Sequence, residues 1–151
     1  MPLSLLLQPQ FNNPDTAEDL QYHSRRTAEV LQLIKANGGK PPFYDDYIMD
    51  QEYLSAINNG TIDEDSILLM SSFDGIQLFR YQQSKVYILV WVILNYSPDK
   101  HYKKKHVLPG CIIPGPNPPK DIDSFLFPSY HHLAVLQHKG LKVYNGYMRE
   151  I

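Results

Sequence analysis

Apolar residues gather in the middle of the chain in three short runs, at 66–73, 85–95 and 106–113. The middle run is rich in Val, Ile, Tyr and Trp, the residue types that suit a pleated, partly buried surface. Pro109 and Gly110 interrupt the third run, and because proline cannot donate to a ladder, this pair indicates a bulge or an edge position. The pattern therefore predicts three β-strands.

The pair Asp74-Gly75, directly after the first run, allows two interpretations. Asp-Gly is typical of a tight hairpin turn. Alternatively, the first strand carries Asp74 at its end and Gly75 lets the backbone bend sharply. Both interpretations stay open on the residues alone.

Helical spacing precedes and follows the three runs. Asp15 or Thr16 is predicted to cap a first helix that ends at Asn37, before two glycines and two prolines. Its apolar residues recur at helical spacing but form only a moderate apolar face, so this helix packs on a neighbouring element or on a partner protein. A short helix is predicted from an Asp50 cap to Ala56.

A last helix is predicted to begin at Asp121 or Asp123, to run to about Lys139 and to end at Gly140. Pro128 is expected to kink it near its start. Its core side is predicted to carry four apolar residues, namely Phe125, Leu126, Leu133 and Leu136.

Residues 1–14 contain prolines flanked by Gln and Asn and show no periodicity, which predicts a loose arm. The expected organisation is therefore this arm, a helical amino-terminal segment over residues 15–60, and a strand-rich domain over residues 61–151. The longest apolar run has nine residues, 86–94, whereas a membrane span needs roughly 20. We therefore expect no membrane-spanning segment, and the start of the chain lacks the basic region and apolar length of a secretion signal.

Composition and charge refine this picture. With 43% hydrophobic residues among 151, the chain can build a core for one domain or for part of a larger one. The single cysteine, Cys111, excludes an internal disulfide. Residues 1–75 carry 4 basic and 12 acidic residues, whereas residues 76–151 carry 10 basic and 4 acidic residues. This asymmetry indicates either a basic binding face or two halves that attract each other.

Several common chemical motifs are absent: there is no P-loop, no dinucleotide glycine fingerprint and no CxxC pair. His131 and His132 are adjacent and so point about 100° apart on a helix, and His138 is two turns further on. These three histidines are therefore not expected to share a metal ion. The acids near residue 45 lack calcium-loop spacing and are interpreted as surface acids.

The densest basic run is Lys103, Lys104 and Lys105, predicted to lie in a turn between two strands. These lysines can contact nucleic-acid phosphates as point charges, without regard to sequence. Alternatively they form a solvated hairpin tip that discourages edge pairing. Asp74 is the second candidate, because a carboxylate on a strand can hold a divalent cation where other acids converge on it.

Several blocks of the chain, taken in order, resemble one family, the transposases of CACTA-type DNA transposons and particularly the fungal Plavaka-like group. The resemblance runs from about Tyr44 to Glu150. It rests on the order and spacing of the blocks rather than on any one of them. The blocks are YDD (44–46), YLSA (53–56), LMSSFDGIQLF (69–79), WVIL (91–94), YKKKHVLPGCIIPGP (102–116) and DSFLFP (123–128).

The resemblance implies a ribonuclease-H-like domain of mixed α+β (α/β) class, which opens with three antiparallel strands followed by a helix. It also implies an acidic triad that binds two Mg²⁺ or Mn²⁺ ions, with Asp74 as the first acid and metal ligand. Such domains cleave DNA and transfer its strands by in-line attack at phosphorus. DNA is therefore the implied partner and the nucleus the implied location, with no membrane partner and no small-molecule substrate.

This chain departs from the family pattern because the second and third acids are missing. One carboxylate cannot form a two-metal cage, so we expect an incomplete domain that binds no metal stably and is inactive alone. The expected function is thus that of an amino-terminal fragment of a DDE-type transposase catalytic region, with an intact transposase chain as a possible partner. The alternative is a co-opted DNA- or protein-binding module without catalysis.

Overall fold

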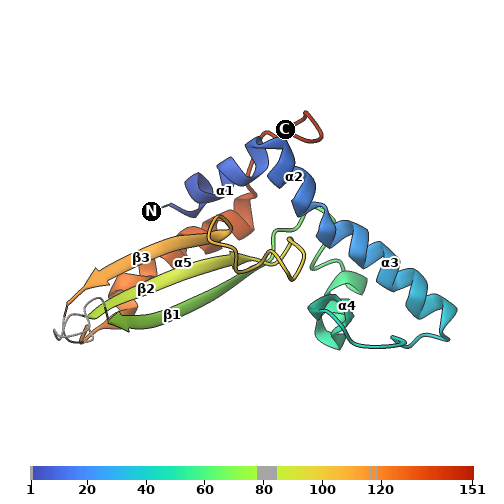
Figure 1. Cartoon of the computed structure of the whole chain (residues 1–151), viewed down its shortest axis with the longest axis horizontal. Helices are drawn as coiled ribbons and strands as arrows, with labels where there is room; N and C mark the ends of the chain where they lie inside the picture. The colour runs from blue at the N-terminus through green and yellow to red at the C-terminus, as the bar shows by residue number, and fades with distance from the viewer. Residues whose placement is uncertain (1, 78–84, 116, 118) are drawn as a thin grey trace.

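The protein combines helices with a three-stranded antiparallel sheet (Figure 1). The computed structural model describes residues 2–77, 85–115, 117 and 119–151. The sheet has the order β1-β2-β3 and consists of β1 (Leu69–Gln77), β2 (Lys85–Ile93) and β3 (Val107–Pro114). The prediction of three strands is confirmed, and the mixed helix-and-sheet class is the observed one.

The middle strand, β2, carries the core of the sheet. Leu89, Trp91 and Ile93 point to one face, are almost completely buried and belong to the main hydrophobic cluster. The predicted bulge at Pro109-Gly110 is confirmed: Leu89 pairs with Cys111 and Val90 with Pro109, so Gly110 is the extra residue. A Cβ atom on Gly110 would lie 2.7 Å from Trp91 Nε1, which explains why glycine occupies this position.

Strand β1 is longer at its carboxyl end than the sequence predicts. Asp74 pairs with Ile88 and Gly75 pairs with Tyr87, and pairing continues to Gln77 opposite Lys85. Both expected positions for Asp74, in a tight turn or at the end of the strand, are therefore wrong. The reason is that β2 begins at Lys85 and offers partners to the weakly strand-forming residues after Phe73, so tertiary pairing overrides local preference.

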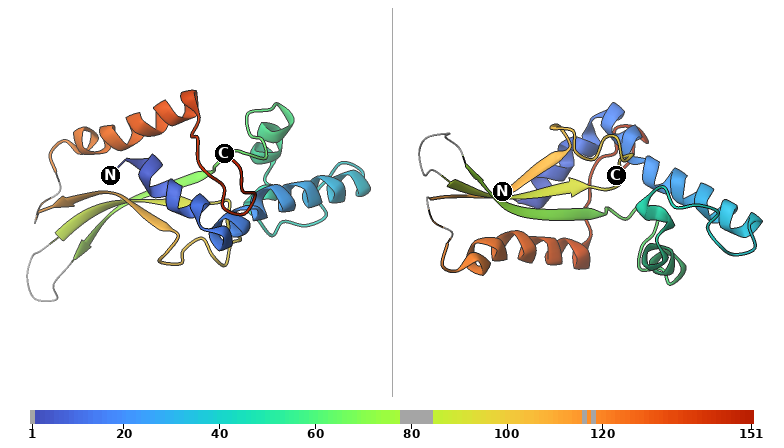
Figure 2. Two further views of the ribbon diagram at one scale, coloured as in Figure 1. Left: turned by 90° about the horizontal axis from the view of Figure 1, so that it is seen from above. Right: turned by 60° about the horizontal axis from the view of Figure 1, so that its bottom comes forward.

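One face of the sheet is covered by α5 (Ile122–Lys139), which Figure 2 shows lying along the strands. The Asp121 side chain accepts a hydrogen bond from the Ser124 amide, as a helix cap should, and Gly140 follows the last turn. Leu126, Leu133 and Leu136 pack on the main cluster as predicted, together with a ring contact between Trp91 and Tyr130 (centroids 5.4 Å apart). The prediction for Phe125 is wrong, because its side chain is 48% exposed.

The expected loose arm over residues 1–14 is instead largely helical. Residues Leu3–Asn12 form α1, and Leu3 and Leu7 are each 2% exposed and belong to the main cluster. Pro9 lies inside this helix and removes one hydrogen bond to the carbonyl of Leu5. Burial of the leucines thus outweighs the weak helical preference.

The predicted first long helix is divided into α2 (Pro14–Leu20) and α3 (Tyr22–Ala36). The cap is Asn13, whose side chain accepts hydrogen bonds from the amides of Asp15 and Thr16, rather than either of those two residues. Pro14 at the first helical position explains this shift, because its fixed φ suits a helix start. The predicted end before the glycine pair is confirmed.

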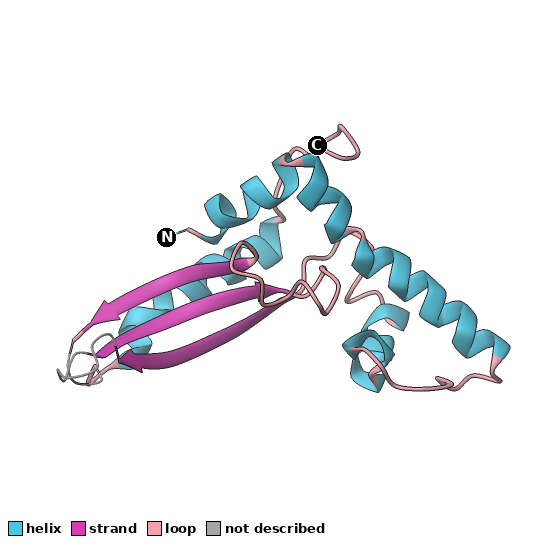
Figure 3. Ribbon diagram, in the orientation of Figure 1, coloured by secondary structure: helices cyan, strands magenta, loops and turns pink. Residues whose placement is uncertain are grey.

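A second, smaller core lies among α3, the 3₁₀ turn η1 (Tyr47–Met49) and α4 (Gln51–Asn58). It is at the opposite end of the molecule from the end of the sheet where Gln77 pairs with Lys85 (Figure 3). Asp50 caps α4 as predicted, accepting from the amides of Glu52 and Tyr53. The buried residues of this second core are Val30, Ile48, Met49 and Tyr53. In the described part of the chain, no helix is long and apolar enough to cross a membrane.

Candidate functional site

Asp74 lies on the face of the sheet that α5 does not cover. Trp91 faces α5, and alternate residues of a strand point to opposite faces, so Ile88 and its partner Asp74 face the other way. The Asp74 side chain is exposed, and its Oδ1 accepts a hydrogen bond from the amide of Gly75 at 2.7 Å. The carboxylate is therefore accessible to solvent and to a ligand.

The neighbours of Asp74 on this open face are mainly apolar. They include Ile88 opposite it, Ile76 two residues along β1, and Ile112 beyond Ile88 on β3. Ile76 and Ile112 are 49% and 61% exposed. Among the described residues, no group of three or more His, Cys, Asp or Glu side chains could hold a metal ion. One carboxylate among isoleucines does not fit a two-metal site.

The lysine run lies in the connection between β2 and β3, as predicted. Lys103, Lys104 and Lys105 are exposed, and the adjacent Tyr102 is 70% exposed. Lys103 Nζ lies 3.7 Å from Asp99 Oδ2, a solvent-exposed pair that contributes little to stability. The loop therefore presents positive charge beside an aromatic ring, a combination that suits phosphate contact and base stacking.

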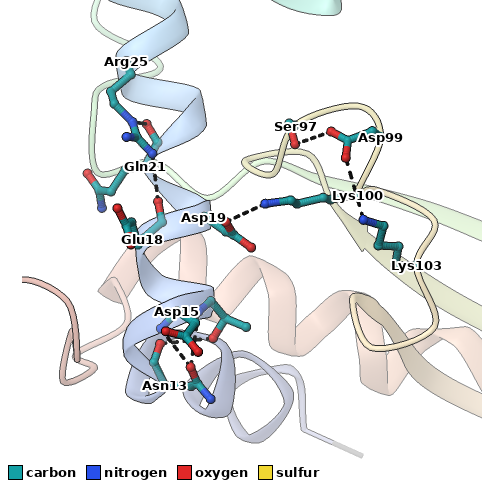
Figure 4. A network of polar contacts seen from close by, with 11 residues as sticks. Asn13, Asp15, Glu18, Asp19, Gln21, Arg25, Ser97, Asp99, Lys100 and Lys103 are labelled. Carbon is teal, nitrogen blue, oxygen red and sulfur yellow. Dashed lines mark hydrogen bonds and ion pairs between the residues drawn. The ribbon is translucent and has the colours of Figure 1, made fainter.

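The same connection is attached to α2 by an ion pair. Lys100 Nζ lies 2.6 Å from Asp19 Oδ1, and Asp99 accepts a hydrogen bond from the Ser97 hydroxyl (Figure 4). The Lys100–Asp19 pair joins the basic second half of the chain to the acidic amino-terminal half. At this contact it favours the interpretation that the two halves attract each other.

The structure does not bring Asp74 and the lysine run together. Asp74 pairs with Ile88, whereas the lysine loop leaves β2 after Ile93 at the other end of the strand. Five residues along a strand span roughly 17 Å. The two candidates are therefore separate features of the surface.

Three buried histidines form a group that sequence reasoning missed. His23, His101 and His106 are exposed by 1%, 6% and 0%. His101 Nε2 lies 2.6 Å from the Tyr96 carbonyl oxygen, and the His106 ring lies against the Tyr96 ring with centroids 4.0 Å apart. Nothing in the spacing of these histidines indicates burial, because each is placed by tertiary packing.

A polar network joins α3 to α4 through one of these histidines. The Tyr53 hydroxyl lies 2.7 Å from His23 Nε2 and 2.6 Å from the Thr27 hydroxyl. The His23 amide donates to the carbonyl of Asn95, and the Asn95 side chain pairs with the segment before β1. This network fixes the helical segment to the end of the sheet, and its role is structural.

Burial changes the titration of this region. Desolvation lowers the pKa of His106, and the nearby Lys105 lowers it further, while Asp19 acts in the opposite direction. Desolvation also lowers the pKa of His23. Neither ring nitrogen of His106 has a hydrogen-bond partner among the described residues, so its neutral form is favoured.

A cavity of about 750 Å³ lies between α1, the start of β1 and the carboxyl end of α5. Leucines, including Leu3, Leu69 and Leu133, form about half of its lining, and Asp63 and Asp65 also line it. His131, His132 and His138 are on α5 but outside this lining. The cavity offers no group of catalytic side chains.

Comparison with known proteins adds no relative: no family model, no curated protein and no solved structure matches the chain.

Proposed function

We propose that this chain is part of the catalytic region of a DDE-type DNA transposase of the CACTA, Plavaka-like group, and that it does not cut DNA by itself. The ordered blocks that end in IPGP and DSFLFP support the assignment. The proposed fold is the opening part of a ribonuclease-H-like domain. The observation that carries it is the β1-β2-β3 antiparallel sheet followed directly by a helix that packs on one face.

In this proposal Asp74 is the first metal-binding acid. Its exposed position on β1, on the face that α5 leaves open, is compatible with that role. The surroundings of Asp74 explain the proposed inactivity, because the described residues beside it are mainly apolar. Mg²⁺ or Mn²⁺ would bind stably only where further acids, such as those of an intact transposase chain, complete the site.

A nicking assay tests the proposed inactivity. Purified protein is incubated with supercoiled DNA and Mg²⁺ or Mn²⁺, alongside Asp74→Asn and, as a matched control, Asp123→Asn in the exposed first turn of α5. We expect no metal-dependent nicking above background for any of the three proteins. Nicking that is lost in Asp74→Asn but kept in Asp123→Asn would show that the chain assembles a working site, and the proposed inactivity would be wrong.

A second candidate function is sequence-independent binding of nucleic acid by the lysine loop. The observation that favours it is the exposure of Lys103, Lys104 and Lys105 beside the exposed ring of Tyr102. On duplex DNA, loss of three phosphate contacts reduces the slope of log affinity against log salt by about 3. On single strands, loss of Tyr102 stacking weakens binding further.

The test compares two triple variants by fluorescence anisotropy over a series of salt concentrations. One replaces Lys103, Lys104 and Lys105 with alanine. The matched control replaces the exposed Lys35, Lys40 and Lys120 and removes the same charge. We expect weaker binding and a shallower salt slope only for the loop variant. Equal effects of the two variants would assign binding to net charge and reject the loop as a site.

A further inference from the structure

The outer edge of β1 is open in the described structure. β1 pairs with β2 on one side, and β2 pairs with β3, so β1 is an edge strand of the sheet. No other described strand pairs with its outer edge, and α5, which the right view of Figure 2 draws below β1, places the Tyr130 hydroxyl 3.0 Å from Ser71 Oγ. Natural edge strands are usually protected by lysine, proline, a bulge or a covering element. β1 has none of the first three between Leu69 and Phe73.

The backbone geometry tells which groups face outward. The Leu94 amide donates to the carbonyl of Leu68, so Leu68 belongs to a hydrogen-bonded pair with β2. Hydrogen-bonded and non-hydrogen-bonded pairs alternate along an antiparallel ladder, so Leu69, Ser71 and Phe73 belong to non-hydrogen-bonded pairs with β2. Their N–H and C=O groups therefore point to the open edge. The Gly75 amide also points outward, because it donates to its neighbour Asp74 rather than to β2.

This edge is complementary to itself. In an antiparallel pair of two β1 strands related by a two-fold axis at Ser71, Leu69 lies opposite Phe73 of the second copy, and Ser71 lies opposite Ser71. The outward groups of these three residues can then form up to about six hydrogen bonds between the copies, two in each pair. The Gly75–Asp74 hydrogen bond is left intact.

The side chains fit this pairing as well as the backbone does. Residues 66–73 carry no charge, so no like charges meet across the axis. Leu69 and Phe73 are partly buried on the α5 face and pack on the main cluster, and each would gain an apolar neighbour across the new strand pair.

We propose that a second copy of this chain pairs with the β1 edge, joining the two sheets into one continuous six-stranded sheet. The contact is isologous, because the same edge is used by both copies, and it therefore closes at a dimer. This inference does not depend on the proposed transposase origin, and either can fail without the other.

The experiment measures the dimer dissociation constant of the full chain by sedimentation velocity over a concentration series. Ser71→Lys places two lysines opposite each other at the axis, whereas Ser72→Lys adds the same charge next to it, opposite Met70. Both serines are exposed, but Ser71→Lys also removes the hydrogen bond between Ser71 Oγ and the Tyr130 hydroxyl of α5 (3.0 Å), so circular dichroism checks that both variants keep the fold. We expect the wild type and Ser72→Lys to dimerise alike, and Ser71→Lys to dimerise at least about tenfold more weakly.

A mixing experiment tests the register. Ser71→Asp mixed with Ser71→Lys places opposite charges at the axis, and the mixture is expected to dimerise more tightly than either variant alone. The proposal is overturned by a wild type that stays monomeric up to about 100 µM, or by equal effects of the two lysine variants. Assembly beyond the dimer, or a mixture no tighter than its components, would equally overturn it.

Discussion

His106 offers a quantitative test of the packing described above. Its ring is fully buried against Tyr96, and neither nitrogen has a hydrogen-bond partner among the described residues. The charged groups that act on it are Asp19, which favours the protonated form, and Lys100, Lys103 and Lys105, which oppose it. Replacement by leucine, His106→Leu, keeps an apolar side chain of similar volume and removes the titrating group.

The magnitude follows from proton linkage. The unfolded chain binds a proton at this histidine below about pH 6.5, whereas burial holds the pKa of the folded form lower. Below this pH the unfolded state binds a proton that the folded state does not, so the free energy of unfolding decreases as the pH falls below about 6.5. Above this pH both states are neutral at this histidine and the free energy of unfolding is unaffected. Between pH 7.5 and 5.5 the loss reaches at most about 1.4 kcal/mol for one histidine.

The assay is urea unfolding at pH 7.5 and 5.5, followed by fluorescence of the single tryptophan, Trp91. We expect the stability of His106→Leu relative to wild type to rise by about 1 kcal/mol when the pH is lowered. His138→Leu, which replaces an exposed histidine at the end of α5, serves as the matched control. If wild type and His106→Leu lose the same stability on acidification, the buried, unpaired state assigned to His106 is wrong.

Three further variants test the core, the bulge and a cap by the same unfolding assay. Leu7→Ala is expected to cost about 2–5 kcal/mol, whereas Leu5→Ala on the exposed side of α1 is expected to change stability by under about 0.5 kcal/mol; equal effects would contradict the helical docking of α1. Gly110→Ala is expected to cost about 1–3 kcal/mol, because its Cβ would lie 2.7 Å from Trp91 Nε1, and an unchanged midpoint would exclude that close approach. Asp50→Ala is expected to cost about 1 kcal/mol through loss of the α4 cap, and Asp50→Asn to restore most of it, since asparagine also accepts these hydrogen bonds; a fully destabilised Asp50→Asn would reject capping as the cause.

The elements with strong local signals could be predicted from the sequence. The run of β-branched and aromatic residues in β2, the Pro109-Gly110 bulge and the Asp50 cap each depend on a few adjacent residues. The carboxyl end of β1 could not be predicted, because Gly75 and Gln77 are ordered by pairing with β2 rather than by their own preference.

The amino-terminal helix shows the other limit of sequence reasoning. Leu3 and Leu7 have helical spacing, but Pro9 and the polar residues around it argue against a helix in this segment. The burial of the two leucines depends on elements more than 80 residues away. The candidate site was predicted in part. The location of the lysine loop is confirmed, Asp74 lies on β1 but not at its end, and the three buried histidines carried no local signal.

The docking of α1 has a consequence for the order in which the chain folds during synthesis. Leu3 and Leu7 leave the ribosome before β2 and α5, yet their packing partners include β2 and the last turns of α5. At about 5–20 residues per second, those partners follow several seconds or more later. During that interval α1 exposes its leucines, so a factor that binds nascent apolar segments would encounter this helix before the sheet exists.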